Sequence, residues 1–250
     1  MDSCSRSVKA YNAVCDEVHT LTVDRRTHRR SRSYQGSRPH RTQAERREQT
    51  RRALLDAALE QIDAGTSFEA LSLRSVARAA GVVPTAFYRY FASMDELGLA
   101  LVEESFQTLR AMLREAREGG IPPERIIHRS VEFLVEHVRA NRLQFTFIAR
   151  VRSSANGVLR HAIRTEIQLV TSELATDLAR FPVLRAWTTE DLQMLAGLLV
   201  NTMIAIVESI LELPPNGGGA SEQKLAEIAR TAEKQLLVPM LAVPRWRSGS

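Results

Sequence analysis

The chain has 250 residues, of which 44% are hydrophobic and 25% charged, with 34 Lys plus Arg against 29 Asp plus Glu. This is enough for a helical body with a small appended domain, and it excludes a chain that needs disulfide or metal staples to fold. Cys4 and Cys15 are the only cysteines in the sequence. They indicate neither a disulfide framework nor a thiolate metal site, so a cytoplasmic location is expected.

The first 41 residues are rich in Ser, Arg, Thr and His and hold too few apolar residues to form a core. Eleven arginines fall between positions 25 and 52, opposed only by Glu45 and Glu48. A basic arm of this kind attracts polyphosphate. We predict that residues 1–41 form a disordered basic tail, and the sequence leaves open whether they belong to the native protein. No apolar segment typical of a signal peptide is present at the start, so secretion is not expected.

Residues 42–92 predict three helices. Thr42 and Glu45 have the spacing of a capping box that opens the first helix, and Gly65 ends it. Ser72 is a plausible N-cap for a second helix reaching residue 80, and Pro84 opens a short third helix that reaches about residue 90. Two short helices joined at Gly81 have the pattern of a helix-turn-helix, in which the inward residues are Val76, Ala77, Ala80, Phe87 and Phe91.

After residue 92 the pattern stays helical to the end of the sequence. We predict helices at about residues 93–117, 123–140, 142–153, 157–180, 188–213 and 221–241. No useful β-alternation, phosphate-binding glycine fingerprint or internal repeat occurs. The expected fold is therefore all-α, with a helix-turn-helix domain at 42–92 and a helical domain at 93–250.

Residues 192–211 have the length and apolar content of a membrane span. Polar residues such as Gln193, Asn201 and Glu208 interrupt this segment, and no aromatic or basic anchor flanks it. We therefore expect a core helix and no membrane.

Several short runs resemble the signature of the TetR family of transcriptional regulators. They are residues 71–74, 76–77, 80–82, 87–91 and 95–97, with the sequences LSLR, VA, AGV, FYRYF and DEL. The resemblance implies an all-helical homodimer that represses transcription by binding palindromic double-stranded operator DNA. It places DNA contacts at Arg74, Pro84, Thr85, Ala86, Tyr88 and Tyr90. We expect Ser72 and Arg89 of the same helix-turn-helix to contribute as well.

Two positions depart from the family pattern. Tyr90 stands where His is common, and Met94 stands where most members have a phosphate-binding Lys. Because methionine cannot neutralise a phosphate, we expect Arg46, Arg47 and Arg51 to supply part of the backbone contacts.

The resemblance also implies dimerisation through the last two helices. In the first of them, apolar residues recur at three- and four-residue steps, as a buried helix face requires. This stripe is the predicted dimer interface: Leu192, Leu195, Leu199, Met203, Ile206 and Ile210.

A narrower resemblance is to the unsaturated-fatty-acid biosynthesis repressors of that family, carried by residues 95–99, 104–105, 145–153 and 164–168. It implies a long-chain acyl thioester as effector. Apolar residues would hold the acyl chain and arginines the phosphates of its carrier: Phe133, Phe145, Phe147, Ile148, Leu159, Ile163 and Ile167, with Arg150, Arg152 and Arg164. The same apolar residues are equally typical of a plain core, and the arginines could instead pair with Glu136 or Glu166.

Other readings stay open at this point. The effector could be a different hydrophobic small molecule, or the chain could be a weakly specific DNA-binding protein that depends on its basic arm. An enzyme would need a constellation around His128, His137 or His161, but the nine-residue spacing of the first two does not place them in adjacent turns of one helical face. We therefore predict no catalytic function, no metal and no cofactor.

Overall fold

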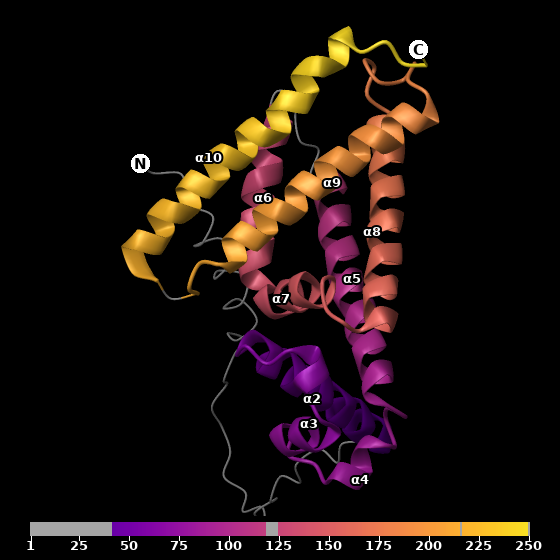
Figure 1. Cartoon of the computed structure of the whole chain (residues 1–250), viewed down its shortest axis with the longest axis vertical. Coiled ribbons are helices and arrows are strands. Elements are labelled where there is room, and N and C mark those ends of the chain that lie inside the picture. Colours follow the sequence, from indigo (N-terminus) through magenta and orange to yellow (C-terminus); the bar gives the residue numbers. More distant parts are fainter. Residues whose placement is uncertain (1–41, 119–124, 216, 250) are drawn as a thin grey trace, which may run out of the picture. The chain divides into compact units, whose positions relative to one another are not determined.

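The computed structural model describes residues 42–118, 125–215 and 217–249, so the predicted tail at 1–41 lies outside the described residues. The described part contains α-helices and short 3-10 turns and no strand, which confirms the all-helical expectation. In chain order (Figure 1) the elements are α2 Gln43–Asp63, η1 Phe68–Ala70, α3 Leu73–Ala79, α4 Pro84–Phe87, α5 Met94–Glu118, α6 Ile126–Ala140, α7 Arg142–Val151, α8 Gly157–Leu178, α9 Thr189–Leu211, α10 Gly218–Ala242 and η3 Val243–Arg245.

Helix starts follow the predicted caps. The Thr42 hydroxyl accepts the Glu45 amide at 3.2 Å, and the Glu45 carboxylate accepts the Thr42 amide at 2.8 Å, which completes the capping box. Ser72 caps α3 in the same way, through the Ser75 amide at 3.1 Å. Two boundaries differ by about three residues. Helix α4 ends at Phe87 and a turn follows to residue 90, and α10 begins at Gly218, three residues before the predicted start.

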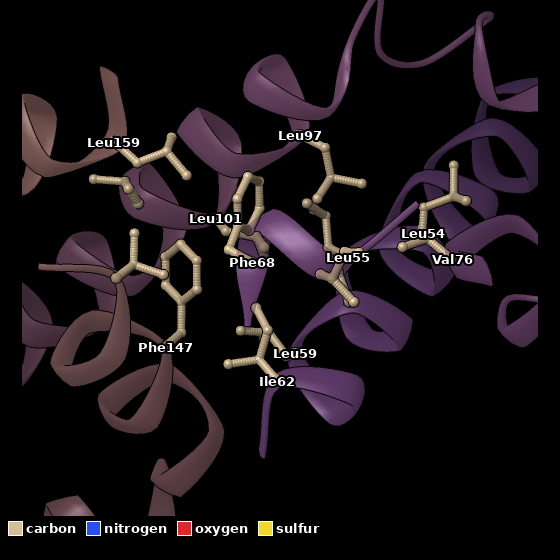
Figure 2. Packing of buried hydrophobic residues seen from close by; sticks show 14 of the residues in the cluster. Leu54, Leu55, Leu59, Ile62, Phe68, Val76, Leu97, Leu101, Phe147 and Leu159 are labelled. Carbon is tan, nitrogen blue, oxygen red and sulfur yellow. The ribbon is translucent and has the colours of Figure 1, made fainter. Parts of the chain in front are cut away.

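The first core cluster joins the helix-turn-helix to the body. It contains buried side chains from α2, η1, α3 and α4 together with side chains from α5, α7 and α8. Figure 2 shows Phe147 and Leu159 reaching the same interior as Leu55, Leu59 and Phe68. Packing therefore continues across residue 92, which the sequence predicts to end the first domain.

The second core cluster fills the body between α5, α6, α8, α9 and α10. Five residues of the predicted dimer stripe are buried in it and Met203 packs against it. Because the chain itself already covers this stripe, the predicted dimer interface is corrected: Leu192, Leu195, Leu199, Met203, Ile206 and Ile210 belong to the intrachain core. A partner would have to use another face of α9.

By length and composition alone, α9 could cross a membrane. Among the described residues, no other helix is both long enough and apolar enough to do so. Its buried face packs in the second cluster, and α8, α10, α6 and α7 all contact it. A third of its apolar window, 33%, is buried within the chain.

Candidate DNA-binding site

The turn between α3 and α4 is fixed by backbone geometry. After the C-cap residue Ala80, Gly81 takes φ 71°, a left-handed conformation that suits glycine. The Gly81 amide donates to the Arg78 carbonyl at 3.1 Å, and the Val82 amide donates to the Ala77 carbonyl at 2.9 Å. This is the hydrogen-bond pattern of a Schellman motif, so α3 ends sharply and the chain turns into α4.

Two aromatic rings hold α4 against the rest of the domain. Phe87 is fully buried and Phe91 nearly so, and their ring centroids lie 5.6 Å apart. Val76 and Ala77 are buried on the α3 side, and α3 packs on both α2 and α4. The inward residues of the predicted helix-turn-helix are thus confirmed as its packing face, and the opposite face is left to solvent.

Most of the predicted DNA contacts lie on that outer face. Arg74, Pro84, Thr85, Tyr88 and Arg89 are exposed, and Tyr88 has an exposed fraction of 64%. Arginine and tyrosine side chains can donate to phosphate oxygens, and arginine can also reach guanine. The structure therefore brings these five side chains together on one short helix-turn-helix.

The other three predicted DNA contacts are less accessible to DNA. The Ser72 hydroxyl is engaged in capping α3. Ala86 is half-buried, and Tyr90 is half-buried and packs against the first core cluster. Met94 packs against the same cluster, in keeping with its lack of charge.

The three arginines expected to support phosphate binding fall into two groups. Arg46 and Arg47 are exposed in the first turns of α2. Arg51 is instead 2.8 Å from Glu104 of α5, and its guanidinium lies 5.7 Å from the centre of the Phe91 ring. Because Arg51 is held inside the protein's own ion network, Arg46 and Arg47 are the arginines of this set that remain available to DNA.

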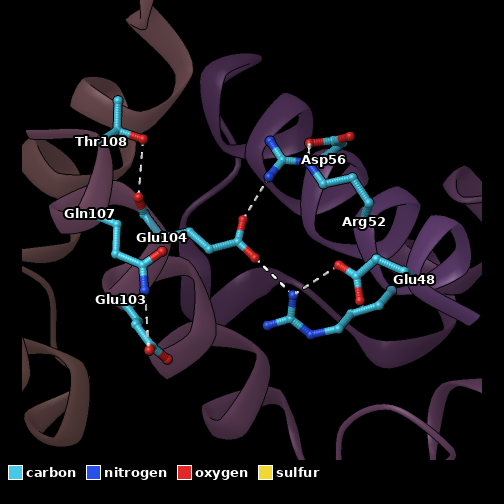
Figure 3. A network of polar contacts seen from close by, with 8 residues as sticks. Glu48, Arg52, Asp56, Glu103, Glu104, Gln107 and Thr108 are labelled. Atoms are coloured by element: carbon cyan, nitrogen blue, oxygen red, sulfur yellow. Dashed lines mark hydrogen bonds and ion pairs between the residues drawn. The ribbon is translucent and has the colours of Figure 1, made fainter. Parts of the chain in front are cut away.

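That network links α2 to α5. The Glu104 carboxylate accepts a hydrogen bond from Arg51 and another from Arg52, each at 2.8 Å. Figure 3 shows Glu104 of α5 facing Arg52 of α2. Arg52 also lies 3.0 Å from Asp56 in the next turn of α2. A hollow of about 390 Å³ opens beside these side chains, with walls from α2, α5 and Gln144 of α7. Its lining is mainly polar, unlike the apolar pocket expected for an acyl chain.

The predicted effector residues divide between the two core clusters. Phe147, Leu159 and Ile163 are buried in the first cluster, and Ile148 and Ile167 pack against it. Phe145 is buried in the second cluster, where Phe133 packs. Leu109 of α5 packs against both clusters and marks the boundary between them.

Two of the predicted effector arginines already interact with residues near the ends of other helices. Arg150 of α7 donates to the carbonyls of Ile62 and Asp63, the last residues of α2. Arg152 lies 2.9 Å from Glu208 of α9. Arg164 is exposed on α8, while Glu166, considered as a possible arginine partner, pairs with Arg110.

Sequence reasoning missed two exposed residues of the helix-turn-helix. Val83, directly before α4, is 65% exposed, and Arg78 is exposed in the last turn of α3. The spacing of Arg78 four residues after Arg74 could have revealed it, because such residues share one helical face. The exposure of Val83 has no signal in the sequence, since valine is ordinarily buried.

Two of the three histidines considered for catalysis contact acceptor groups within the protein. His128 Nδ1 lies 2.7 Å from Glu233, and His137 Nδ1 lies 2.8 Å from the Phe133 carbonyl. His161 is exposed on α8. Within residues 42–118, 125–215 and 217–249, no three His, Cys, Asp or Glu side chains gather as a metal ion would require.

Comparison with known proteins adds to this geometry. Residues 54–101 match the model of the bacterial regulatory proteins of the tetR family, a segment that runs from α2 through the helix-turn-helix into α5. The match covers the elements that carry the exposed Arg74, Thr85 and Tyr88.

Solved structures of similar fold cover most of the chain. A TetR-like transcriptional regulator from Rhodococcus sp. RHA1 is 18% identical with a TM-score of 0.58, covering 81% of this chain and 99% of that one. The fatty acid degradation regulator FadR from Bacillus halodurans is 16% identical with a TM-score of 0.57, covering 75% and 94%. FadR from Bacillus subtilis, solved in complex with stearoyl-CoA, is 14% identical with a TM-score of 0.58, covering 74% and 96%. Residues 54–101 are therefore similar to the bacterial regulatory proteins of the tetR family, and the described part of the chain has the fold of the TetR-like transcriptional regulator from Rhodococcus.

Proposed function

We propose that the protein is a cytoplasmic, ligand-responsive repressor of transcription that binds a palindromic operator as a dimer. The observation that supports this most directly is the helix-turn-helix, whose apolar face is buried while Arg74, Thr85, Tyr88 and Arg89 stand outward within the segment that matches the tetR family. A single short recognition helix reads few base pairs, so a symmetric pair of half-sites is expected.

Selection from randomised double-stranded DNA at a stated salt concentration tests operator reading. We expect a palindromic consensus, and an affinity at least about a thousandfold above that for random DNA. A basic DNA-binding protein without sequence preference would yield no consensus. The double variant Arg46→Ala/Arg47→Ala is expected to flatten the dependence of affinity on salt by the loss of phosphate contacts, without changing the consensus.

The dimer contact that we propose uses the exposed apolar face of α9 and the neighbouring end of α10. Met194 and Leu198, four residues apart on α9, are 50% and 52% exposed, and Leu237, Val238 and Leu241 are exposed on α10. The two helices pack on each other. Exposed large apolar side chains on neighbouring helices are typical of an interface with a second copy.

We further propose a long-chain acyl thioester as effector. FadR from Bacillus subtilis shares this fold and binds stearoyl-CoA in its solved structure, and the predicted acyl-contact residues lie on both sides of the boundary that Leu109 marks between the core clusters. A ligand entering there would separate α7 from α6 and shift α2, to which α7 is joined. The named FadR neighbour from Bacillus halodurans regulates fatty acid degradation, so it supports an acyl ligand more than a role in biosynthesis.

Operator gel shifts with oleoyl-CoA, stearoyl-CoA and free coenzyme A test the effector. We expect one or both acyl thioesters to change operator affinity about 5- to 150-fold, which corresponds to a coupling of about 1–3 kcal/mol. Free coenzyme A, which lacks the acyl chain, is the control and is expected to have no effect. If neither thioester changes the affinity, the acyl proposal fails and a different hydrophobic effector takes its place.

A further inference from the structure

Val83 is an apolar side chain held out into solvent at the start of α4. It is 65% exposed, whereas its neighbour Val82 packs against the first core cluster. Its backbone is extended, with φ −70° and ψ 143°, as the following Pro84 requires. Because valine is branched at Cβ, its side chain is also stiff. Val83 is therefore a rigid apolar projection at the tip of the helix-turn-helix.

The residues beside Val83 offer little hydrogen bonding to base edges. Pro84 and Thr85 are exposed and Ala86 is half-buried, so residues 83–86 present methyl and methylene groups and a single side-chain hydroxyl, that of Thr85. The exposed cations Arg74, Arg78 and Arg89 belong to the same helix-turn-helix. Such a surface can anchor on phosphates through its rim, while its centre is suited to apolar contact.

In the major groove, thymine is the base that presents a methyl group. We propose that Val83 is a specificity-determining residue that packs against a thymine C5-methyl in each operator half-site. This inference rests on the proposed function, since it assumes that the helix-turn-helix reads operator DNA. It goes further by naming the base that the tip of α4 recognises and the residue that recognises it.

The test replaces thymines of the selected operator one at a time by deoxyuridine, which removes the C5-methyl and leaves the base pair intact. For the wild-type protein, we expect one thymine position per half-site at which this replacement weakens binding about fourfold, the effect of withdrawing one buried methyl-sized group. Replacement in both half-sites should weaken binding about sixteenfold. The Val83→Ala variant should bind the thymine operator more weakly and lose most of its sensitivity at that position, with other positions unchanged.

Val158→Ala is the matched control, because Val158 is 51% exposed on α8, outside the helix-turn-helix. It should keep the full sensitivity to deoxyuridine. If the wild-type protein selects an operator but tolerates deoxyuridine at every thymine, or if Val83→Ala keeps the same sensitivity, the inference is overturned while the proposed function stands. If no operator is selected, both fail. The DNA substitution needs no altered protein, so the test holds even if a variant folds poorly.

Discussion

Gly98 lies where α5 comes closest to the helix-turn-helix and to α8. A Cβ at this position would lie 2.6 Å from Leu159 Cδ1 and 2.7 Å from Phe68 Cζ. Both neighbours are buried in the first core cluster and have little room to move. The absence of a side chain at Gly98 thus lets η1, α5 and α8 meet in one tight contact.

Replacing Gly98 by alanine is expected to destabilise the protein by about 1–3 kcal/mol, because the added methyl overpacks a filled core. The loss would appear as a lower urea midpoint in equilibrium unfolding. Gly219→Ala is the matched control, since Gly219 lies in the first turn of α10 with nothing within 4 Å of the new Cβ. Equal stability of the two variants would contradict the close approach at Gly98.

His128 of α6 contacts two carboxylates, Glu132 in its own helix and Glu233 of α10. Its Nδ1 lies 2.7 Å from Glu233 and its Nε2 3.2 Å from Glu132. The hydrogen bond to Glu233 and the charge of Glu132 raise the pKa of His128 above its usual value of 6.5, and nearby Arg125 opposes this. The protonated imidazole is therefore favoured in the folded state.

A raised pKa in the folded state gives stability that is fully present below the unfolded pKa and is lost as pH rises through the folded pKa. We expect the His128→Ala variant to be less stable than the wild type at about pH 5.5 and nearly equal to it at about pH 8.5. Urea midpoints at the two pH values measure this. The double variant His128→Ala/Glu233→Gln should show little loss beyond the single variant; additive losses would exclude the pairing.

At the scale of elements, side chains of α7 bind the C-terminal end of α2. Asp63, the last residue of α2, is an acid at the negative end of a helix dipole, an unfavourable position by itself. The buried Thr146 donates to its carboxylate at 3.2 Å, and Arg142 lies 4.0 Å from it. Arg142 also donates to the Leu211 carbonyl at 2.6 Å, so α7 holds the ends of α2 and α9 together.

Thr146→Val keeps the shape of the side chain and removes its hydroxyl. The variant is expected to lose about 1–2 kcal/mol of stability, because the Asp63 carboxylate loses a buried donor. Thr176→Val is the control: its hydroxyl is exposed and bonds only the Ser172 carbonyl in its own helix, so a change within about 0.5 kcal/mol is expected. Equal urea midpoints for the wild type and Thr146→Val would show that the hydrogen bond from Thr146 to Asp63 does not stabilise the protein.

The helix boundaries could be predicted where their signals are local. The capping of α2 by Thr42 and the turn at Gly81 depend on hydrogen bonds between residues at most five positions apart. The role of Arg51 could not be predicted, because its partner Glu104 is 53 positions away and the neighbouring Arg46 and Arg47 look alike in sequence. The local sequence pattern therefore predicted the helices and the outward face of the helix-turn-helix. It could not predict which arginines are engaged in ion pairs within the protein.

At the scale of the whole molecule, α9 shows why an apolar stripe read from the sequence does not identify a dimer interface. The helix is apolar nearly all round, so periodicity alone selects two faces with similar strength. The face with Leu195 and Leu199 became the core, and the face with Met194 and Leu198 was left exposed. Only the packing of α6, α8 and α10 on one side decides between them, and that depends on residues distant in sequence.

If the exposed face joins two copies, a charge placed there should separate them. Leu198→Glu is expected to give a monomer at micromolar concentration in light scattering, because burying an unpaired carboxylate in an apolar interface is costly. Leu169→Glu makes the same change at an exposed leucine of α8, 48% accessible, and should stay dimeric. Operator affinity should fall with the loss of the dimer, since one half-site alone then holds each helix-turn-helix. A Leu198→Glu variant that remains dimeric, or a wild-type protein that is monomeric at this concentration, would place the contact elsewhere or remove it.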